Sequence, residues 1–512
     1  MIIKIKQFIN KHFTFTVFII FAVVIFSLYG KSLFFDWTYY DDDVLILDKQ
    51  QYLSFSNIEK IFTNTVFGQE KDKFCRPILN LTFLVEKYIY GINPYGYHFT
   101  NILLHLFVVF FIFVFLSERY DSKKTFLLCL LFACHPSVVQ AVSWIPGRND
   151  SLLTLFIILA FYFIKKYTDT NKVYFLFIHL SCLCLSLLTK ETAIVAPIFY
   201  LAYLYFKDIK IKKIALLVFI WIIIILMYFL YRHYVLSYQE YSLTIYELLK
   251  NFFVSFPAIT KYIANIFFPI KLSIFPVLLE LNYLLCISGI LVFIFIFLQF
   301  KKYNLKVVIF GFCWFLFFIF PTFLMPNNQF YDHRIYLALI GILIVLLELI
   351  NKTNNAVNKK NIMVFSLIFI SFCFITYSYE LKFKNKEVFW VNAYLDSPKS
   401  DIACAMLAGL FLENKNYKKA EEKYLEAIKL KADSKHYVNL SSVYIKTKQF
   451  DIAENCLIKA LSLDKYNPNV YYNLALIYKI KKDKQKYEEM KKLYVMVYNN
   501  TNKFSKIERE DI

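Results

Sequence analysis

Residues 13–43 read FTFTVFIIFAVVIFSLYGKSLFFDWTYYDDD, an apolar stretch that leads directly into Asp41, Asp42 and Asp43. Residues 13–30 are long enough to cross about 30 Å of hydrocarbon as a helix. The basic residues before this stretch are typical of a signal peptide, but no small-residue cleavage site follows and further apolar segments come later. We therefore expect an uncleaved first membrane span, followed by a long connection that opens with the acidic run.

The composition of the whole chain favours a polytopic membrane protein. Of the 512 residues 59% are hydrophobic, 57 are Phe and 40 are Tyr, and the mean hydropathy is +0.49. The net charge of +20 comes largely from short Lys and Arg clusters between apolar runs, which favours membrane orientation over nucleic-acid binding. The ten cysteines show no metal-ligand spacing, so we interpret them as packing residues.

Eleven segments are apolar enough to be helical membrane spans. They lie near residues 13–30, 97–117, 125–143, 150–165, 173–189, 191–206, 214–231, 282–300, 307–325, 335–350 and 361–379. With the N-terminus inside, the inner connections hold 19 Lys and Arg residues and the short outer connections hold 3. The positive-inside rule predicts this orientation.

Two long connections, 31–96 and 232–281, then lie outside, as does everything after residue 380. Residues 252–270 have two interpretations, either a re-entrant or interfacial helix or a twelfth span. A twelfth span would place the basic segments KKYNLK and NKTNNAVNKKN outside. We therefore favour the re-entrant or interfacial helix.

From residue 400 onward the sequence becomes charged and amphipathic, with a period close to 34 residues. Leu407, Leu440 and Leu474 are each followed four residues later by an aromatic residue, and small residues recur at fixed offsets on both helices of each unit. This pattern predicts tetratricopeptide repeats, against a general array of helical hairpins as the alternative. We expect an all-α fold, in which a membrane helical bundle precedes an α-solenoid. The expected parts are a transmembrane domain over 1–380, a linker over 381–400, and a repeat domain over 401–500 with units 401–433, 434–467 and 468–501.

Most of the unusual polar residues fall on the side predicted to be outer. On the second span, His98, Asn101 and His105 share one helix face by their i, i+3, i+7 spacing. Ionisable groups in or near hydrocarbon cost free energy. Their gathering on the outer side therefore predicts an outward-facing polar cavity. Taken singly, each residue has a simpler interpretation as a core histidine, a lipid-headgroup anchor or a solvated loop. The candidate site residues are Asp41, Asp42, Arg76, His98, Asn101, His105, His135, Arg148, Lys190, Glu191 and Arg334.

Carboxylates that face several cations at a membrane surface suit the transfer of a group from a lipid-linked phosphate. The cations would hold the phosphate leaving group, and a carboxylate would take the acceptor's proton or hold a metal ion. The chain has only 9 Gly, and none of them forms a phosphate-cradling loop or a nucleotide-binding fingerprint. These observations favour a lipid-phosphate donor over a nucleotide donor.

The motifs in the first 200 residues, together with a segment near residue 334, resemble the GT-C superfamily of polyprenyl-phosphate-sugar-dependent glycosyltransferases. The resemblance is strongest to the transmembrane and tetratricopeptide-repeat O-mannosyltransferase group. It rests on YDDD (40–43), RPILNLTF (76–83), NPYGYHFTNILLH (93–105), LLFACHPSVVQAVSWIPGRNDSLL (130–153), KETAI (190–194) and HRIYL (333–337). It implies a many-helix fold with a large first outer loop, 31–96, whose acidic pair acts in catalysis.

Carried over to this chain, the resemblance makes Asp41 and Asp42 the candidate catalytic residues. It places Arg76, His98, His105, His135, Arg148, Lys190 and Arg334 around the same outer cavity, and Asn101 and Glu191 belong to the matched motifs. One departure is Gln140, where relatives commonly have Glu, and this leaves the identity of the sugar and the use of a divalent metal ion open.

The implied function is an integral-membrane transferase that moves a mannose-like hexose from a polyprenyl-phosphate donor to a protein hydroxyl on the extracytoplasmic face. The repeats would bind the protein acceptor or a partner protein. The alternatives are a non-enzymatic membrane scaffold whose repeats recruit partners, and a lipid-linked oligosaccharide ligase or transporter. Low Gly with heavy Lys, Ile, Phe and Asn usage favours a bacterial inner membrane, with the N-terminus cytoplasmic and the repeats extracytoplasmic.

Overall fold

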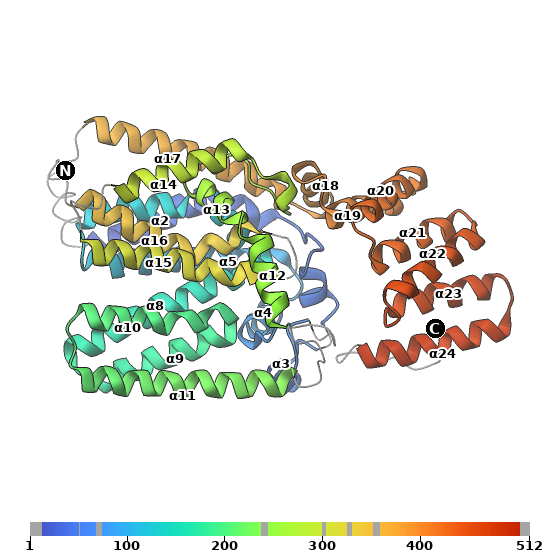
Figure 1. Cartoon of the computed structure of the whole chain (residues 1–512), viewed down its shortest axis with the longest axis horizontal. Helices are drawn as coiled ribbons and strands as arrows, with labels where there is room; N and C mark the ends of the chain where they lie inside the picture. Colours follow the sequence, from blue (N-terminus) through green and yellow to red (C-terminus); the bar gives the residue numbers. More distant parts are fainter. Residues whose placement is uncertain are drawn as a thin grey trace.

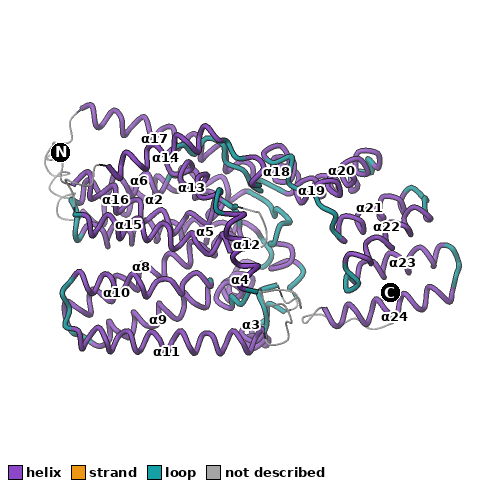
Figure 2. The backbone as a smooth tube through the Cα atoms, viewed as in Figure 1, coloured by secondary structure: helices purple, strands orange, loops and turns teal. Residues whose placement is uncertain are grey.

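The protein is described here from a computed structural model that places residues 13–50, 52–67, 74–236, 244–298, 304–324, 330–351 and 359–501. These residues form helices joined by loops, and no strand occurs among them (Figure 2). The expected all-α fold is therefore confirmed.

The helices form two parts, a bundle of long, roughly aligned helices and a curved array of shorter ones (Figure 1). The helices of the first part are α2 (Phe13–Tyr29), α3 (Ile58–Thr63), α4 (Pro77–Tyr90), α5 (Pro94–Ser117), α6 (Ser122–Ala133), α7 (Val139–Ser143), α8 (Arg148–Thr170), α9 (Val173–Thr189), α10 (Ala196–Phe206), α11 (Ile211–Leu236), α12 (Ile245–Ser255), α13 (Ala258–Phe267), α14 (Tyr283–Leu298), α15 (Leu305–Ile319), α16 (Ile335–Asn351) and α17 (Lys359–Glu380). Those of the second part are α18 (Lys386–Asp396), α19 (Asp401–Glu413), α20 (Tyr417–Leu430), α21 (Ser434–Lys446), α22 (Phe450–Leu463), α23 (Pro468–Ile480) and α24 (Lys484–Thr501).

The number of membrane-capable helices agrees with the expected eleven spans only in part. Seven helices within the described ranges are long and apolar enough to cross a membrane, and a bent pair brings the number to eight. Three of the expected spans are shorter apolar helices, Val173–Thr189, Glu191–Phe206 and Tyr283–Ile296. The chain is thus a multi-pass integral membrane protein, but eleven full-length spans are not confirmed.

The expected single span over 125–143 is broken in the middle. Its two halves, Ser122–Ala133 and Pro136–Ser143, are bent by 55°. Pro136 cannot donate a backbone hydrogen bond, and the His135 Nδ1 instead accepts one from the Ser137 backbone at 3.2 Å. A short 3₁₀ turn follows at Pro136–Val138, and α7 starts in a new direction.

The ambiguous segment 252–270 also forms two helices, α12 and α13, which are separated at Pro257. Neither is among the membrane-capable helices found in the described ranges. Figure 1 shows α12 lying across one end of the bundle, and its Ile245, Tyr246 and Phe253 side chains are exposed. Residues 252–270 are therefore not one continuous membrane-capable helix, and their placement as an interfacial or re-entrant segment stays a prediction.

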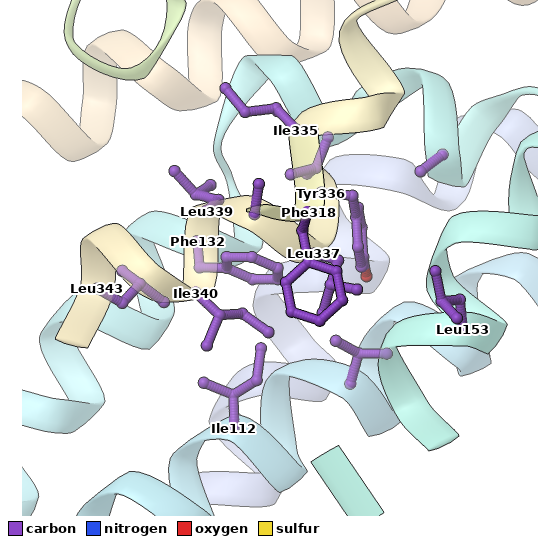
Figure 3. Close-up of a cluster of buried hydrophobic side chains, with 14 of the residues drawn as sticks. Ile112, Phe132, Leu153, Phe318, Ile335, Tyr336, Leu337, Leu339, Ile340 and Leu343 are labelled. Atoms are coloured by element: carbon purple, nitrogen blue, oxygen red, sulfur yellow. The ribbon is translucent and has the colours of Figure 1, made fainter. Parts of the chain in front are cut away.

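The core of the bundle is formed where α5, α6, α8, α15 and α16 meet. Ile112, Phe132, Leu153, Phe318 and Ile340 point into this cluster (Figure 3). At the crossing of α15 and α16, a Cβ on Gly311 would lie 2.5 Å from the Gly341 carbonyl oxygen. These two glycines let the helix backbones approach closely, as small residues do in membrane bundles. This packing fixes the start of α16, which carries part of the site described below.

The second part repeats a helix pair three times, as α19–α20, α21–α22 and α23–α24. The turn inside each pair contains a lysine with positive φ, and these residues, Lys415, Lys448 and Lys482, are 33 and 34 residues apart. The same side-chain bond also recurs, from Tyr444 to Glu421 at 2.7 Å and from Tyr478 to Glu454 at 2.6 Å. The period read from the sequence is thus a repeat of structure.

The repeats lie at one end of the bundle, opposite the end from which α2 starts (Figure 1). We name this the repeat end; here α2, α9 and α17 finish and α5, α8 and α16 begin. Residues 381–400, expected to be a linker, contain α18, whose Phe389 and Trp390 are fully buried.

Candidate active site

An ion pair at the repeat end joins three of the bundle's elements. The Lys190 Nζ, just after α9, lies 2.7 Å from the Asp150 Oδ1 on the first turn of α8. The other carboxylate oxygen of Asp150 lies 3.9 Å from the Nε2 of His333, directly before α16. Burial and the charge of Arg76 lower the pKa of Lys190, whereas Asp150 acts in the opposite direction. Asp150 therefore connects a lysine and a histidine that are far apart in sequence.

A second lysine, Lys261 on α13, also binds a carboxylate near His333. Lys261 and Asn265 lie one turn apart on α13, and both donate to the Asp332 Oδ1, at 2.6 and 2.8 Å. Lys261 also donates to the Phe330 carbonyl oxygen at 3.0 Å. The break at Pro257 turns α13 so that these side chains meet the start of α16.

Arginines complete the charged network. Arg76, directly before α4, lies 3.1 Å from the Glu191 Oε2, and Arg232, near the end of α11, lies 3.4 Å from the Glu191 Oε1. Asn149 bridges Arg76 to α9, because its amide can accept from the Arg76 Nη1 at 2.8 Å and donate to the Thr189 carbonyl at 2.9 Å. Glu191 thus holds two arginines from distant parts of the chain.

The cations of these networks converge on His333. The charges of Lys190, Arg334, Arg76 and Lys261 all act on its imidazole ring. We name these four residues the cation cluster. The side chains of Arg76, Lys190 and Lys261 are only 12–15% exposed, so water screens their charges weakly. An anionic group such as a phosphate would find several charge-assisted donors here.

The aspartates of the acidic run occupy contrasting surroundings. Asp42 is 1% exposed, and its carboxylate accepts from the backbone N–H of Thr38 at 2.7 Å, Tyr40 at 2.8 Å and Asp43 at 3.1 Å. It also accepts from the Thr38 hydroxyl at 3.0 Å. Burial raises the pKa of Asp42 to about 7, although the bonds to Thr38 and Tyr40 oppose this shift. The hydrogen bonds of the Asp42 carboxylate are therefore made within its own loop.

Asp41 has a left-handed backbone, with φ +63°, and so has Tyr39, with φ +55°. This conformation costs a non-glycine residue about 1–2 kcal/mol. The Asp41 charge raises the pKa values of both Tyr40 and Tyr331, whose hydroxyl oxygens lie 2.7 Å apart, and Arg334 lowers them; burial is the largest cause of each shift. Asp41 and Arg334 therefore lie near the same pair of tyrosine hydroxyls. Asp41 is the carboxylate of the run that borders the cation cluster.

Not all of the predicted site residues join this cluster. Arg148 is fully buried, and its guanidinium donates to the Asn101 Oδ1 at 2.7 Å, to the Tyr97 carbonyl at 2.8 Å and to Glu86. The Asn101 amide in turn donates to the backbone carbonyls of residues 142, 144 and 145. We name Glu86, Asn101 and Arg148 the buried tie, because they join α4, α5 and α8.

The predicted histidines are core residues. His105 bonds to the Tyr336 hydroxyl at 2.6 Å and to the Ala133 carbonyl at 3.1 Å. His135 bonds to the Ile266 carbonyl at 3.1 Å and caps the turn after α6. His98 is 1% exposed, and neither ring nitrogen has a hydrogen-bond partner among the described residues. Of the binding residues expected from the sequence, Arg76, Lys190, Glu191 and Arg334 come together, whereas His98, Asn101, His105, His135 and Arg148 are enclosed elsewhere.

The structure also adds residues that were not among the candidates, namely Tyr40, Asp150, Lys261, Tyr331, Asp332 and His333. The signal for Lys261 was a lone cation with Asn265 at i+4 in an apolar stretch. Gln140, the departure from the family pattern, accepts from the His333 backbone N–H at 3.4 Å. No group of three or more His, Cys, Asp or Glu side chains suited to a metal ion occurs in the described ranges. Two surface hollows lie elsewhere, one lined by residues 33–36 and 93–95 and one between α10 and α11.

Comparison with known proteins gives matches in both parts of the chain. Residues 85–231 match the dolichyl-phosphate-mannose-protein mannosyltransferase family, and residues 435–467 match a tetratricopeptide repeat. The first match contains α5 to α10 and most of α11, and it therefore includes Asp150, Lys190 and Glu191. The second confirms that the chain contains a tetratricopeptide repeat.

Curated relatives are similar over a limited region. Protein O-mannosyl-transferase TMTC2 of Mus musculus is 34% identical over 152 residues, which are 28% of this chain and 18% of the relative. Protein O-mannosyl-transferase TMTC1 of Homo sapiens is 33% identical over 157 residues, 26% of this chain and 17% of the relative. TMTC3 of Homo sapiens is 31% identical over 144 residues, 27% and 16% respectively. The match thus spans less than a fifth of these relatives' length. The resemblance inferred from the sequence is confirmed as a similarity: part of the transmembrane region is similar to this mannosyltransferase family and to the TMTC protein O-mannosyl-transferases, and the chain also contains a tetratricopeptide repeat.

Proposed function

We propose that this chain transfers a hexose from a polyprenyl-phosphate donor to a hydroxyl group of a protein. The observation that carries the proposal is geometric: Lys190 and Lys261 bind Asp150 and Asp332 beside His333, and Arg334 lies over the ring of Tyr331, whose hydroxyl bonds to that of Tyr40, next to Asp41 in sequence. Charged side chains in a weakly screened site are strong catalytic groups because their attraction is not shared with water.

The reaction follows from this arrangement. The acceptor oxygen attacks the anomeric carbon of the sugar, and the bond from that carbon to the phosphate oxygen breaks. Asp41 takes the hydroxyl proton, and the cation cluster takes up the charge of the departing polyprenyl phosphate. Because one direct displacement occurs, the anomeric configuration inverts. Asp42 holds the loop that carries Asp41 and does not touch the reacting atoms.

Mannose is the hexose that the names of the relatives support, and Gln140 is the position at which we expect sugar preference to differ. The hydroxyl acceptor belongs to a protein, since stacked helix pairs provide an extended surface suited to a polypeptide. We further propose that the repeat end is extracytoplasmic and that the membrane is a bacterial inner membrane. The excess of Lys and Arg in the connections at the opposite end supports this orientation.

The experiment is intact-mass analysis of extracytoplasmic proteins from cells that contain or lack this chain. We expect a hexose-sized increment on at least one protein, and we expect it to vanish without the chain. Cells that carry the Asp41→Asn variant, inserted in the membrane in normal amounts, should also lack the increment. Unchanged masses in all three strains would contradict the proposal and favour the membrane scaffold that recruits partners through its repeats.

A further inference from the structure

Helix α18, which joins the last membrane helix to the first repeat, packs directly on the loop that carries Asp41. The ring centroids of Phe389 and Trp390 lie 6.2 and 5.6 Å from that of Tyr40, and both side chains are fully buried. One turn earlier, the Lys386 Nζ lies 5.0 Å from the centroid of the Tyr39 ring. One short helix therefore contacts both residues that precede Asp41.

Further contacts hold Tyr40 from its other sides. The Phe275 ring lies 4.7 Å from Tyr40 and stacks on Trp390 at 5.3 Å, so it fills the space between the loop and α18. The Trp144 indole stacks on Tyr40 at 5.4 Å and donates its N–H to the Tyr40 carbonyl at 3.0 Å. Tyr40 cannot shift without displacing α18 or the turn before α8.

Helix α18 is also tied firmly to the first repeat. Ala403 and Leu407 of α19 belong to the same buried cluster as Phe389 and Trp390. The Tyr394 hydroxyl accepts from the Lys423 Nζ at 2.7 Å and donates to the Glu426 carboxylate at 3.3 Å, both on α20. The first helix pair is therefore one of the two parts that hold α18 in place.

The membrane bundle holds α18 chiefly at its C-terminal end, and the Asp36 backbone N–H also donates to the Lys384 carbonyl just before the helix, at 2.9 Å. Lys382 and Asp396 form an ion pair at 2.6 Å, and the hydroxyl oxygens of Ser273 and Ser397 lie 2.7 Å apart. The backbone N–H of Lys399 donates to Glu280 at 2.7 Å. The helix thus forms a rigid bridge between the repeats and the bundle.

The backbone of the loop around Asp41 needs the support that this bridge provides. Tyr39 and Asp41 both have left-handed φ values, which persist in a non-glycine residue only where the surroundings enforce them. Part of the surrounding support comes from α18, through Lys386 at Tyr39 and through the Phe389 and Trp390 rings at Tyr40. Without that support the loop can relax toward ordinary backbone angles, which would turn the Asp41 carboxylate away from the tyrosine hydroxyls.

We propose that Phe389 and Trp390 are positioning residues, through which the first repeat holds Asp41 in its reactive orientation. This inference rests on the proposed function. It gives the repeats a role in the chemical step itself, in addition to the binding of an acceptor.

The test compares Trp390→Ala and Trp390→Phe with Trp221→Ala in the full-length protein in proteoliposomes. Trp221 is an equally buried tryptophan that packs on His179 and Tyr200, away from the loop. The substrates are a polyprenyl-phosphate mannose and a serine- and threonine-containing peptide. We expect Trp390→Ala to lower kcat by about tenfold to a hundredfold, because a small misplacement of a reacting group has such an effect. The KM values for both substrates should stay within about twofold, and Trp390→Phe should keep most of the activity.

Hydrogen exchange of the amides over residues 38–47 provides a readout that does not depend on activity. We expect faster exchange in Trp390→Ala, where the loop loses its support, and unchanged exchange in Trp221→Ala. Lys386→Met, which removes a charge that is 29% exposed, is the variant that leaves the core intact, and it should lower kcat in the same direction.

A wild-type kcat in Trp390→Ala, or an equal loss of kcat in Trp221→Ala, would overturn the positioning role. So would unchanged exchange over 38–47 in both variants. If wild-type protein transfers mannose and Asp41→Asn does not, such a result removes only this inference. If the wild type itself transfers nothing, the proposed function and this inference both fail.

Discussion

Arg148 and Asp150 stand two residues apart on the first turn of α8, yet they serve two regions of opposite character. Arg148 belongs to the buried tie, where its three guanidinium nitrogens are all bonded to Asn101, Tyr97 and Glu86. Asp150 faces the cation cluster, where it meets Lys190 and His333. One motif thus supplies both the support and the site. A charged residue in a matched motif is therefore a candidate for chemistry only when its hydrogen bonds leave it accessible to a ligand.

The acidic run repeats this contrast at closer range. Asp42 accepts four hydrogen bonds within its own loop, whereas the charge of Asp41 acts on the Tyr40 and Tyr331 hydroxyls beside Arg334. We therefore expect variants of the enclosed residues to change stability, and variants of the residues at the cluster to change activity.

The largest stability effect is expected at the buried tie. Arg148→Ala leaves the Glu86 carboxylate, 5% exposed, without its cation, and burial already raises the pKa of Glu86. Breaking such a buried pair costs about 3–5 kcal/mol. Thermal unfolding in detergent should show this loss for Arg148→Ala, and a smaller one for Arg148→Lys, which keeps the charge. If Arg148→Ala kept wild-type stability but lost donor binding, the tie would have to be counted as part of the site.

Removal of a cation from the cluster should have the opposite profile. Arg334→Gln is expected to lower transfer by about a hundredfold, the effect of losing one charge-stabilising donor in an active site, with little change in thermal stability. Arg119→Gln, an exposed position directly after α5, is the matched control and should keep its activity. Kinetics with polyprenyl-phosphate mannose distinguish the two. Equal rates for both variants would exclude Arg334 from the site.

The smallest effect is expected at Asp42. Asp42→Asn turns an amide N–H toward backbone donors, so one of the buried donors loses its acceptor, at a cost of about 1–3 kcal/mol. The folded-state pKa of Asp42 is about 7, raised from 3.8. The carboxyl's contribution is therefore fully present below the unfolded pKa and is lost as pH rises through the folded pKa.

Unfolding of wild type and Asp42→Asn at several pH values tests this sign. The stability advantage of wild type should shrink between about pH 4 and about pH 7 and stay constant above that range. An advantage that grows over this range would show that hydrogen bonding, and not burial, controls the titration of Asp42.

The helices were largely predictable from the sequence because crossing hydrocarbon demands long apolar runs. The breaks within helices could not be predicted in this way. The bend at Pro136 and the separation of α12 from α13 depend on which partners satisfy the backbone groups that the break leaves without a helical hydrogen bond. Residues 381–400 were predicted only as a linker, because the burial of Phe389 and Trp390 depends on contacts with the loop around Tyr40, which is far away in sequence.

The candidate site was predictable in part, for a reason visible on α5. The spacing of His98, Asn101 and His105 correctly places them along one face, but spacing does not reveal whether a face borders a site or the core. His105 bonds to Tyr336 of α16, and Asn101 bonds to Arg148. Lys261 was missed because its helix had no assigned depth in the membrane. Lys190 and Arg334 were found because each lies at the end of an expected span, where a cation can reach a site, and Arg76 because it lies in a matched motif of the first outer loop.

We propose Asp41, and not its neighbour Asp42, as the catalytic base. The most direct measurement is transfer of mannose from polyprenyl-phosphate mannose to an acceptor peptide by Asp41→Asn and Asp42→Asn, purified in parallel and reconstituted in equal amounts. We expect a loss of about a hundredfold or more for Asp41→Asn at unchanged thermal stability, as for removal of a general base, and retained transfer for Asp42→Asn at a temperature where it stays folded. Normal transfer by Asp41→Asn would contradict the account.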